Sequence, residues 1–161
     1  MPKSETSAFD DKNFGADSEM SAMTVDWGKP ADFFLGTFIK ARHNVDTQYG
    51  PNSIYQFFSE RGSFHKLEGK GRLAKPAETP TIIDKGQTWE IWGRGDIFCG
   101  QANSLRPGQI VKILYVEDVD SKNGPRKDVK IFAPKNNEGK PLMNQEWLDT
   151  QGVTAADFGG M

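Results

Sequence analysis

Cysteine and histidine are almost missing from this sequence, and it has no long apolar run. Cys99 is the one cysteine among 161 residues, which excludes an intrachain disulfide and a cysteine-based zinc site and suits a reducing cytoplasm. His43 and His65 are the only histidines, and neither has a Cys, Asp or Glu at the spacing of metal ligands. No stretch reaches the roughly 18 apolar residues of a membrane span. We therefore expect a cytoplasmic protein without membrane contact, cofactor, metal or catalytic site.

What the sequence does contain is aromatic residues and an uneven distribution of charge. Its 11 Phe and 4 Trp can fill the core of one compact domain. Residues 1–32 carry 3 basic and 7 acidic side chains, residues 33–133 carry 15 and 11, and residues 134–161 carry 2 and 4. A basic middle between acidic ends suits a protein that binds a polyanion, with tails that oppose indiscriminate binding or recruit partners.

Alternating apolar and polar side chains predict an all-β domain over residues 33–133. Strands are predicted at residues 33–45, 53–59, 88–93, 110–117 and 128–133. Gly36, within the first of these, can bend the chain so that one strand serves both halves of a small barrel. Gly50-Pro51 predicts the first turn, and Asn123-Gly124 predicts the last hairpin.

Two longer connections separate the predicted strands. Residues 67–87 contain several Gly and Pro, which predicts a long loop between the second and third strands, with a short pairing at residues 81–83. Residues 95–104 are a shorter connector with one helical turn. Three strands, a connector and a hairpin are the order of the OB fold, so we predict a five-stranded OB-type barrel.

Both ends of the chain are predicted to lie outside this barrel. Residues 1–32 show no sustained hydrophobic period and are expected to be mostly disordered. Residues 134–161 are expected to form an acidic tail with a short helix over residues 144–150, for which Asn144 is a suitable N-cap. We expect the barrel to fold without this tail.

Short motifs in the central segment point to a known family. They are Gly36-Thr37-Phe38, Tyr49-Gly50, Tyr55 with Phe57, Trp92-Gly93, and Leu105 with Pro107-Gly108. By these residues, segment 33–133 resembles the OB-fold single-stranded DNA-binding proteins, particularly the short, divergent members found in bacteriophages. The resemblance implies a binding protein, not an enzyme, that coats single-stranded DNA in replication or recombination, in the host cytoplasm if a phage encodes it.

The resemblance also implies a role for the C-terminal tail. Bacterial members of the family recruit replication and repair proteins through an acidic tip that ends in Phe. In this sequence Asp157-Phe158 is followed by Gly159-Gly160-Met161, so the Phe is not terminal. Trp147, Asp157 and Phe158 are the candidate residues for docking replication or recombination proteins.

Basic and aromatic side chains occur together in the predicted strands. Basic groups can follow the phosphates of a single strand while aromatic rings stack on its bases. Phe38, Lys40 and Arg42 are predicted to share a face of the first strand, and Trp92 to share a face with Arg94 in the third. The candidate nucleic-acid contacts are Phe38, Lys40, Arg42, Tyr49, Phe58, Lys70, Arg72, Trp92, Arg94, Lys122, Arg126 and Lys127.

Other interpretations of these residues stay open. Phe38 and Trp92 could be core residues, with Leu35 and Trp89 facing outward. The acidic residues within 117–120 could suggest a magnesium site, although such a cluster is more often the solvated end of a strand. An OB-type module that binds protein, or a structural module of a virion, would also expose aromatic rings, and no feature of the sequence distinguishes RNA from DNA.

Overall fold

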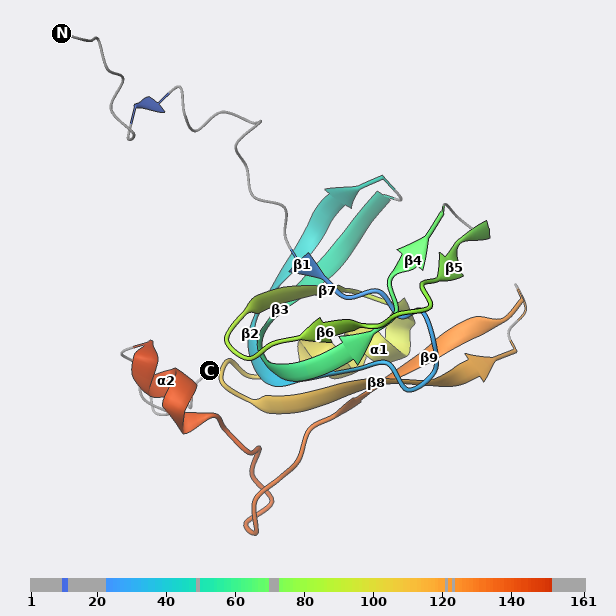
Figure 1. Cartoon of the computed structure of the whole chain (residues 1–161). Coiled ribbons are helices and arrows are strands. Elements are labelled where there is room, and N and C mark those ends of the chain that lie inside the picture. Colours follow the sequence, from blue (N-terminus) through green and yellow to red (C-terminus); the bar gives the residue numbers. More distant parts are fainter. Residues whose placement is uncertain are drawn as a thin grey trace, which may run out of the picture.

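Strands dominate the part of the chain that the computed structural model describes, namely residues 10–11, 23–48, 50–69, 73–120, 122 and 124–151. The five longest strands are β2 (Phe33–Thr47), β3 (Gly50–Phe64), β7 (Thr88–Trp92), β8 (Ile110–Val119) and β9 (Arg126–Phe132). The short strands are β1 (Met23–Thr24), β4 (Leu67–Glu68), β5 (Lys75–Pro76) and β6 (Thr81–Ile83), and the helices are α1 (Gly95–Asn103) and α2 (Gln145–Thr150). The prediction of a β-rich domain is confirmed, and each predicted strand has a counterpart (Figure 1).

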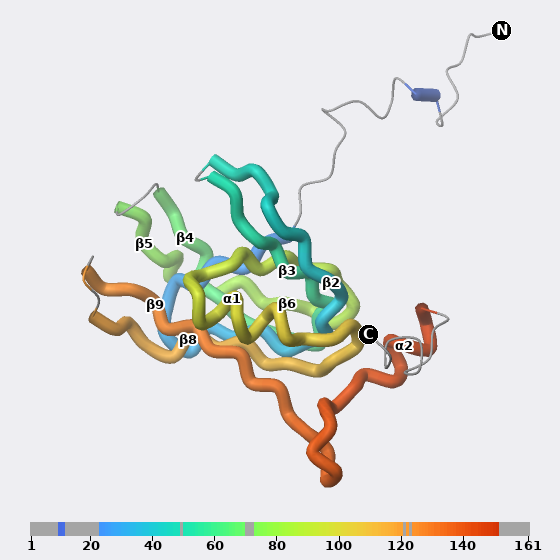
Figure 2. Tube along the Cα trace, turned by 180° about the vertical axis from the view of Figure 1, so that it is seen from behind, coloured from blue at the N-terminus to red at the C-terminus, as the bar shows by residue number. Residues whose placement is uncertain are grey.

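One curled sheet contains seven of these strands, in the order β1-β7-β3-β2-β8-β9 with β6 paired to β3. The pairing predicted at residues 81–83 is therefore present. β4 and β5 pair with each other inside the segment predicted as a long loop. α1 lies in front of the sheet when the molecule is seen from behind (Figure 2). Neither helix of the described residues is long and apolar enough to cross a membrane.

The sheet is not closed into the predicted barrel. Closure would pair the edge of β7 with β9, but that edge pairs in parallel with β1, with Met23 opposite Trp89 and Thr24 opposite Glu90. The segment that follows β1 reaches β9, because the Nζ atom of Lys127 donates a hydrogen bond to the carbonyl of Trp27. The N-terminal segment thus occupies the edge that the predicted closure required.

Gly36 lies where β2 is paired on both sides, although the barrel whose two halves this strand was predicted to serve is not closed. Residues 33–37 of β2 pair with β8 on one side, and β2 pairs with β3 over its whole length on the other. A Cβ atom on Gly36 would lie 2.4 Å from the carbonyl oxygen of Phe58 and 2.6 Å from the ring of Phe34. Any other residue would therefore force β2 and β3 apart at this position.

The core inside the curled sheet is rich in aromatic rings. Phe57 is in its centre, with ring centroids 5.7 Å from Phe34 and 5.5 Å from Phe38. α1 contributes Phe98 and Ala102 to the same cluster. Tyr55 packs edge-on against Phe98, with centroids 6.1 Å apart. Burial of such rings provides a large hydrophobic stabilisation for a domain of this size.

The ordered structure begins earlier than the sequence predicted. Val25 and Trp27, placed by prediction in a mostly disordered tail, are buried members of the core. Asp32 is buried, with 3 % of its surface exposed, and it anchors this segment through hydrogen bonds of its carboxylate. Its Oδ2 atom accepts hydrogen bonds from the backbone N–H groups of Gly28 at 2.9 Å, Lys29 at 3.0 Å and His65 at 2.9 Å. Its Oδ1 atom lies 2.7 Å from Nδ1 of His65.

The C-terminal segment also differs from the expected separate tail. The predicted helix is confirmed as α2, and Asn144 caps it by accepting a hydrogen bond from the backbone N–H of Trp147 at 3.0 Å. The side chain of Asn144 also donates to Oγ1 of Thr37 at 2.7 Å, which joins α2 to β2. Leu148 is fully buried and Trp147 is 8 % exposed, so in this conformation Trp147 is not available to a partner. Asp157 and Phe158 lie outside the described residues.

We expect Asp32→Ala to lower the free energy of unfolding by about 3 kcal/mol, because it leaves several buried donors without an acceptor. Urea denaturation would measure this change. Asp84→Ala is the matched control, since Asp84 is exposed, and it should cost well under about 1 kcal/mol. Equal losses for the two variants would refute the anchoring role of Asp32.

We expect Leu148→Ala to lower the free energy of unfolding by about 3 kcal/mol, since it removes a fully buried side chain that packs beside Gly108. Leu142→Ala is the control, because Leu142 is 41 % exposed, and it should cost less than about 1 kcal/mol. If both variants unfold at the same urea concentration as the unchanged protein, α2 does not contribute to the folded domain.

Candidate nucleic-acid interface

The outer face of β2, β3 and β7 carries several of the predicted contacts. Tyr55 and Ile91 lie opposite each other and are fully buried in the core. The rows on either side of an inward row point outward, because side chains alternate along each strand. These outward rows are Arg42, Ile54 and Trp92, and Lys40, Gln56 and Glu90, although Ile54 and Glu90 are buried. Lys40 and Arg42 are exposed, whereas Trp92 is half-buried.

Glu90 neutralises part of the positive charge on this face. Its Oε2 atom accepts a hydrogen bond from Nη2 of Arg42 at 2.6 Å and another from Nε2 of Gln56 at 3.2 Å. The Glu90 side chain has little contact with solvent, so the ion pair is partly desolvated on that side. Arg42 is held in place by this contact and is a weaker candidate for phosphate binding than an unpaired arginine.

A basic cleft opens next to the end of β7. We define it by Arg94, Arg126 and Lys127, which with Gly93 and Gly95 line a cavity of about 330 Å³. The same three cations line an adjoining cavity of about 280 Å³ that reaches Asp96 and Phe98 at the start of α1. Two distant segments meet here, because Arg94 immediately precedes α1 and Arg126 begins β9.

Local backbone conformation explains why the chain brings these cations together. Gly95 has a φ of +68°, a conformation that glycine adopts without strain, and it turns the chain from β7 into α1 directly after Arg94. On the other side, Gly124 with a φ of +102° reverses the chain between β8 and β9, just before Arg126. The cleft therefore lies where two turns face each other.

The three cations of the cleft differ in their contacts with the protein and in their exposure to solvent. Lys127 donates to the Trp27 carbonyl, and its Nζ atom lies 5.7 Å from the centre of the Tyr115 ring. Burial, and then the nearby charge of Arg94, lower the pKa of Lys127. Arg94 and Arg126 are exposed. Lys127 therefore forms a fixed wall of the cleft, while Arg94 and Arg126 can reach a ligand.

Acidic and phenolic groups behind the cleft modulate its charge. Arg94 stays protonated at neutral pH, as arginines do in proteins. Burial, and then the hydrogen bond that its hydroxyl donates to Asp118, raise the pKa of Tyr115. Asp118 also lies opposite Lys127 across the β8–β9 pair. Asp96 and Asp128 line the adjoining cavity, whereas the cleft itself is lined by three cations and no carboxylate.

Phe38 is not part of this interface. It is 4 % exposed and belongs to the core, so the prediction that its ring shares an accessible face with Lys40 is wrong. The cause is a register shift between Phe38 and Lys40, where Ile39 is an extra residue on β2. Such a bulge places two residues that would share a face in a regular strand on opposite sides of the sheet.

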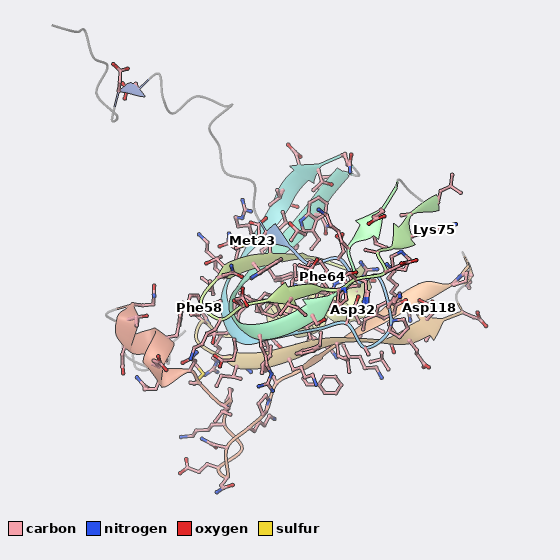
Figure 3. All side chains as sticks on the ribbon, in the orientation of Figure 1. Met23, Asp32, Phe58, Phe64, Lys75 and Asp118 are labelled. Carbon is pink, nitrogen blue, oxygen red and sulfur yellow. The ribbon has the colours of Figure 1, made fainter. Side chains whose placement is uncertain are left out.

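The other predicted contacts are divided among several places. Phe58 is half-buried on the outer face near α2, whereas Asp118 marks the opposite end, beside the β8–β9 hairpin and the cleft (Figure 3). Lys122 is exposed in that hairpin. The structure thus separates Phe58 from the basic cleft, whereas Trp92 directly precedes the cleft residues Gly93 and Arg94 in the sequence. The candidates Tyr49, Lys70 and Arg72 lie outside the described residues.

Tyr55 lies in the part of the core beneath this face and is excluded from solvent. The residue is fully buried, and its hydroxyl donates a hydrogen bond to Oδ1 of Asn103 at 2.9 Å. Burial, and then a hydrogen bond with Cys99, raise the pKa of Tyr55 from 10.0 to about 12. The phenol is therefore neutral at every pH at which binding would be measured.

Comparison with known proteins adds no assignment to this geometry. No family model matches the chain, and no match is found among curated proteins or among solved structures. Within the described ranges, His, Cys, Asp and Glu do not gather in groups of three or more that could hold a metal ion. Any functional assignment therefore depends on the cations and rings described above.

We expect the free energy of unfolding to fall as the pH rises from about 10 to about 12. In this range the unfolded chain loses the Tyr55 proton while the folded protein keeps it, so alkali favours the unfolded state. Tyr55→Phe should make the decline shallower, and urea denaturation across this range would measure it. A decline as steep in the variant as in the unchanged protein would contradict the raised pKa.

Proposed function

We propose that this protein binds single-stranded DNA without strong sequence preference and coats it during replication or recombination. The observation that carries the proposal is the basic cleft, whose cavity is lined by Arg94, Arg126 and Lys127 together with Gly93, the residue directly after Trp92. Phosphates would lie against the arginines of the cleft, and a base would stack on the exposed part of the Trp92 ring. Stacking on a ring contributes ~1–3 kcal/mol per base and tolerates every base.

The connections between strands support an OB-type fold for this proposal. β2, β3 and β7 follow one another as an antiparallel meander, α1 comes next, and the β8–β9 hairpin returns to pair with β2. Oligonucleotides bind OB folds on the face of the second and third strands and on the loops after the first and fourth. In this chain those parts are the outer face of β3 and β7 and the turn that leads to Arg126. In an OB-type assignment, the pairing of β7 with β1 would replace the closure of the barrel.

A fluorescence titration of the full chain with labelled oligo-dT and with a matched duplex, at two salt concentrations, tests the proposal. Oligo-dT should bind more tightly than the duplex, and its affinity should fall with salt as protein cations displace counterions. Equal binding of the two ligands, or no binding, would falsify the proposal. Specific capture of a protein that nuclease treatment does not release would then favour the alternative of a protein-interaction or virion module.

We expect the double variant Arg94→Gln/Arg126→Gln to bind oligo-dT roughly ten times more weakly. Loss of two phosphate contacts should also reduce the slope of log affinity against log salt by about 1.4. Lys135→Gln/Lys140→Gln is the matched control, because it removes the same charge from exposed positions before α2. If the control weakens binding as much as the cleft variant does, the cleft is not the binding site.

A further inference from the structure

The other half of the sheet has a second outer face that combines rings with cations. Phe34 and Ile113 lie opposite each other and are fully buried, so the rows on either side of them point outward. One outward row contains Phe33, Leu114 and Lys130. The next row contains, in order across the sheet, Arg61 of β3, Leu35 of β2, Lys112 of β8 and Phe132 of β9. We define the β8 face by Phe33, Arg61, Lys112, Leu114, Lys130 and Phe132.

The side chains of the β8 face are accessible. Phe132 is 47 % exposed, an unusual position for so large a ring. Arg61, Lys112 and Lys130 are exposed as well, and Phe33 and Leu114 are half-buried. The Nζ atom of Lys112 lies 5.3 Å from the centre of the Phe33 ring, so cation and ring form one continuous surface.

The charge of this face is positive and little compensated. The two rows contain three cations and no carboxylate. Acidic groups lie beside the two rows. Asp128, at the next outward position along β9, has an oxygen 3.7 Å from Nζ of Lys130, and Glu60 and Glu146 line a cavity together with Leu35. A second copy of the chain is a poor occupant for the face, because a two-fold contact would place the same cations against one another. A polyanion with stackable rings complements both its charge and its aromatic side chains.

β9 connects this face to the basic cleft. Arg126 begins the strand at the cleft, and Phe132 ends it on the β8 face. The six steps along the strand from Arg126 to Phe132 span about 20 Å at roughly 3.3 Å per residue. A ligand that occupies both surfaces must therefore be longer than one that fills the cleft alone.

We propose that the β8 face is a second contact surface for the single-stranded DNA that the cleft binds. This inference rests on the proposed function and extends it, because it makes the bound strand continue along β9 from the cleft to Phe132. Phosphates would lie near Lys112, Lys130 and Arg61, and bases would stack on Phe132 and on the open side of Phe33. Short oligonucleotides would engage the cleft alone.

Titration of the full chain with oligo-dT of about 8 and about 30 nucleotides tests the second surface. We expect Lys112→Gln/Lys130→Gln to bind the long oligonucleotide about five to ten times more weakly and to reduce its salt slope by about 1.4. Binding of the short oligonucleotide should change less than about twofold, since the cleft is intact. Phe132→Ser should lower the affinity for the long oligonucleotide. The slope of log affinity against log salt should change little, because the ring carries no charge.

Matched controls separate this inference from the proposed function. Lys135→Gln/Lys140→Gln removes two exposed charges elsewhere, and Leu73→Ser removes an apolar side chain that is 84 % exposed. Thermal unfolding would verify that the variants fold. Suppose that the unchanged protein binds both oligonucleotides. If the β8-face variants then bind the long one with the same affinity as their controls, the inference fails and the proposed function stands. If the unchanged protein binds neither oligonucleotide, both fail.

Discussion

The close approach of β2 and β3 at Gly36 is the constraint on which the other features of this domain depend. Because Gly36 has no side chain, the Phe58 carbonyl and the Phe34 ring can occupy the space where a Cβ atom would lie. β2 can then bend and pair with β8 through its first residues while it remains paired with β3. The two halves of β2 contribute to two different outer faces. The first half contributes Phe33 to the β8 face, and the second half contributes Lys40 and Arg42 to the outer face of β2, β3 and β7.

The second important feature is the uneven distribution of charge among the outer faces of the sheet and the cleft. On the outer face of β2, β3 and β7, Glu90 pairs with Arg42 and so offsets one of the two exposed cations, Lys40 and Arg42. The cleft and the two rows of the β8 face each contain three cations and no carboxylate, with Asp128 next to Lys130. A polyanion is therefore expected to bind at the margins of the meander and along β9, where the electrostatic potential is least compensated. The face between them would contribute mainly through the Trp92 ring.

Residues near one another in the sequence determined most of what could be predicted. Alternation located all five long strands, and the capping side chain of Asn144 located α2. The errors concern contacts between distant residues. No local pattern shows that Ile39 is an extra residue, although this bulge turns Phe38 into the core. Val25 and Trp27 are isolated in a polar segment, and they are buried because Asp32 fixes the chain beside residues more than thirty positions away. The grouping of Arg94 with Arg126 likewise depends on tertiary structure.

The pairing of β1 with β7 has a consequence for the behaviour of the protein at high concentration. An unpaired strand edge offers free N–H and C=O groups to another chain and is a common starting point for aggregation. β1 and the residues after it cover part of this edge in β7, next to the apolar side chains of Trp89 and Ile91. Proteolytic removal of residues 23–32 would expose the unpaired backbone N–H and C=O groups at the edge of β7. In the full chain, the N-terminal segment covers this part of the edge and leaves fewer backbone groups free to pair with a second chain.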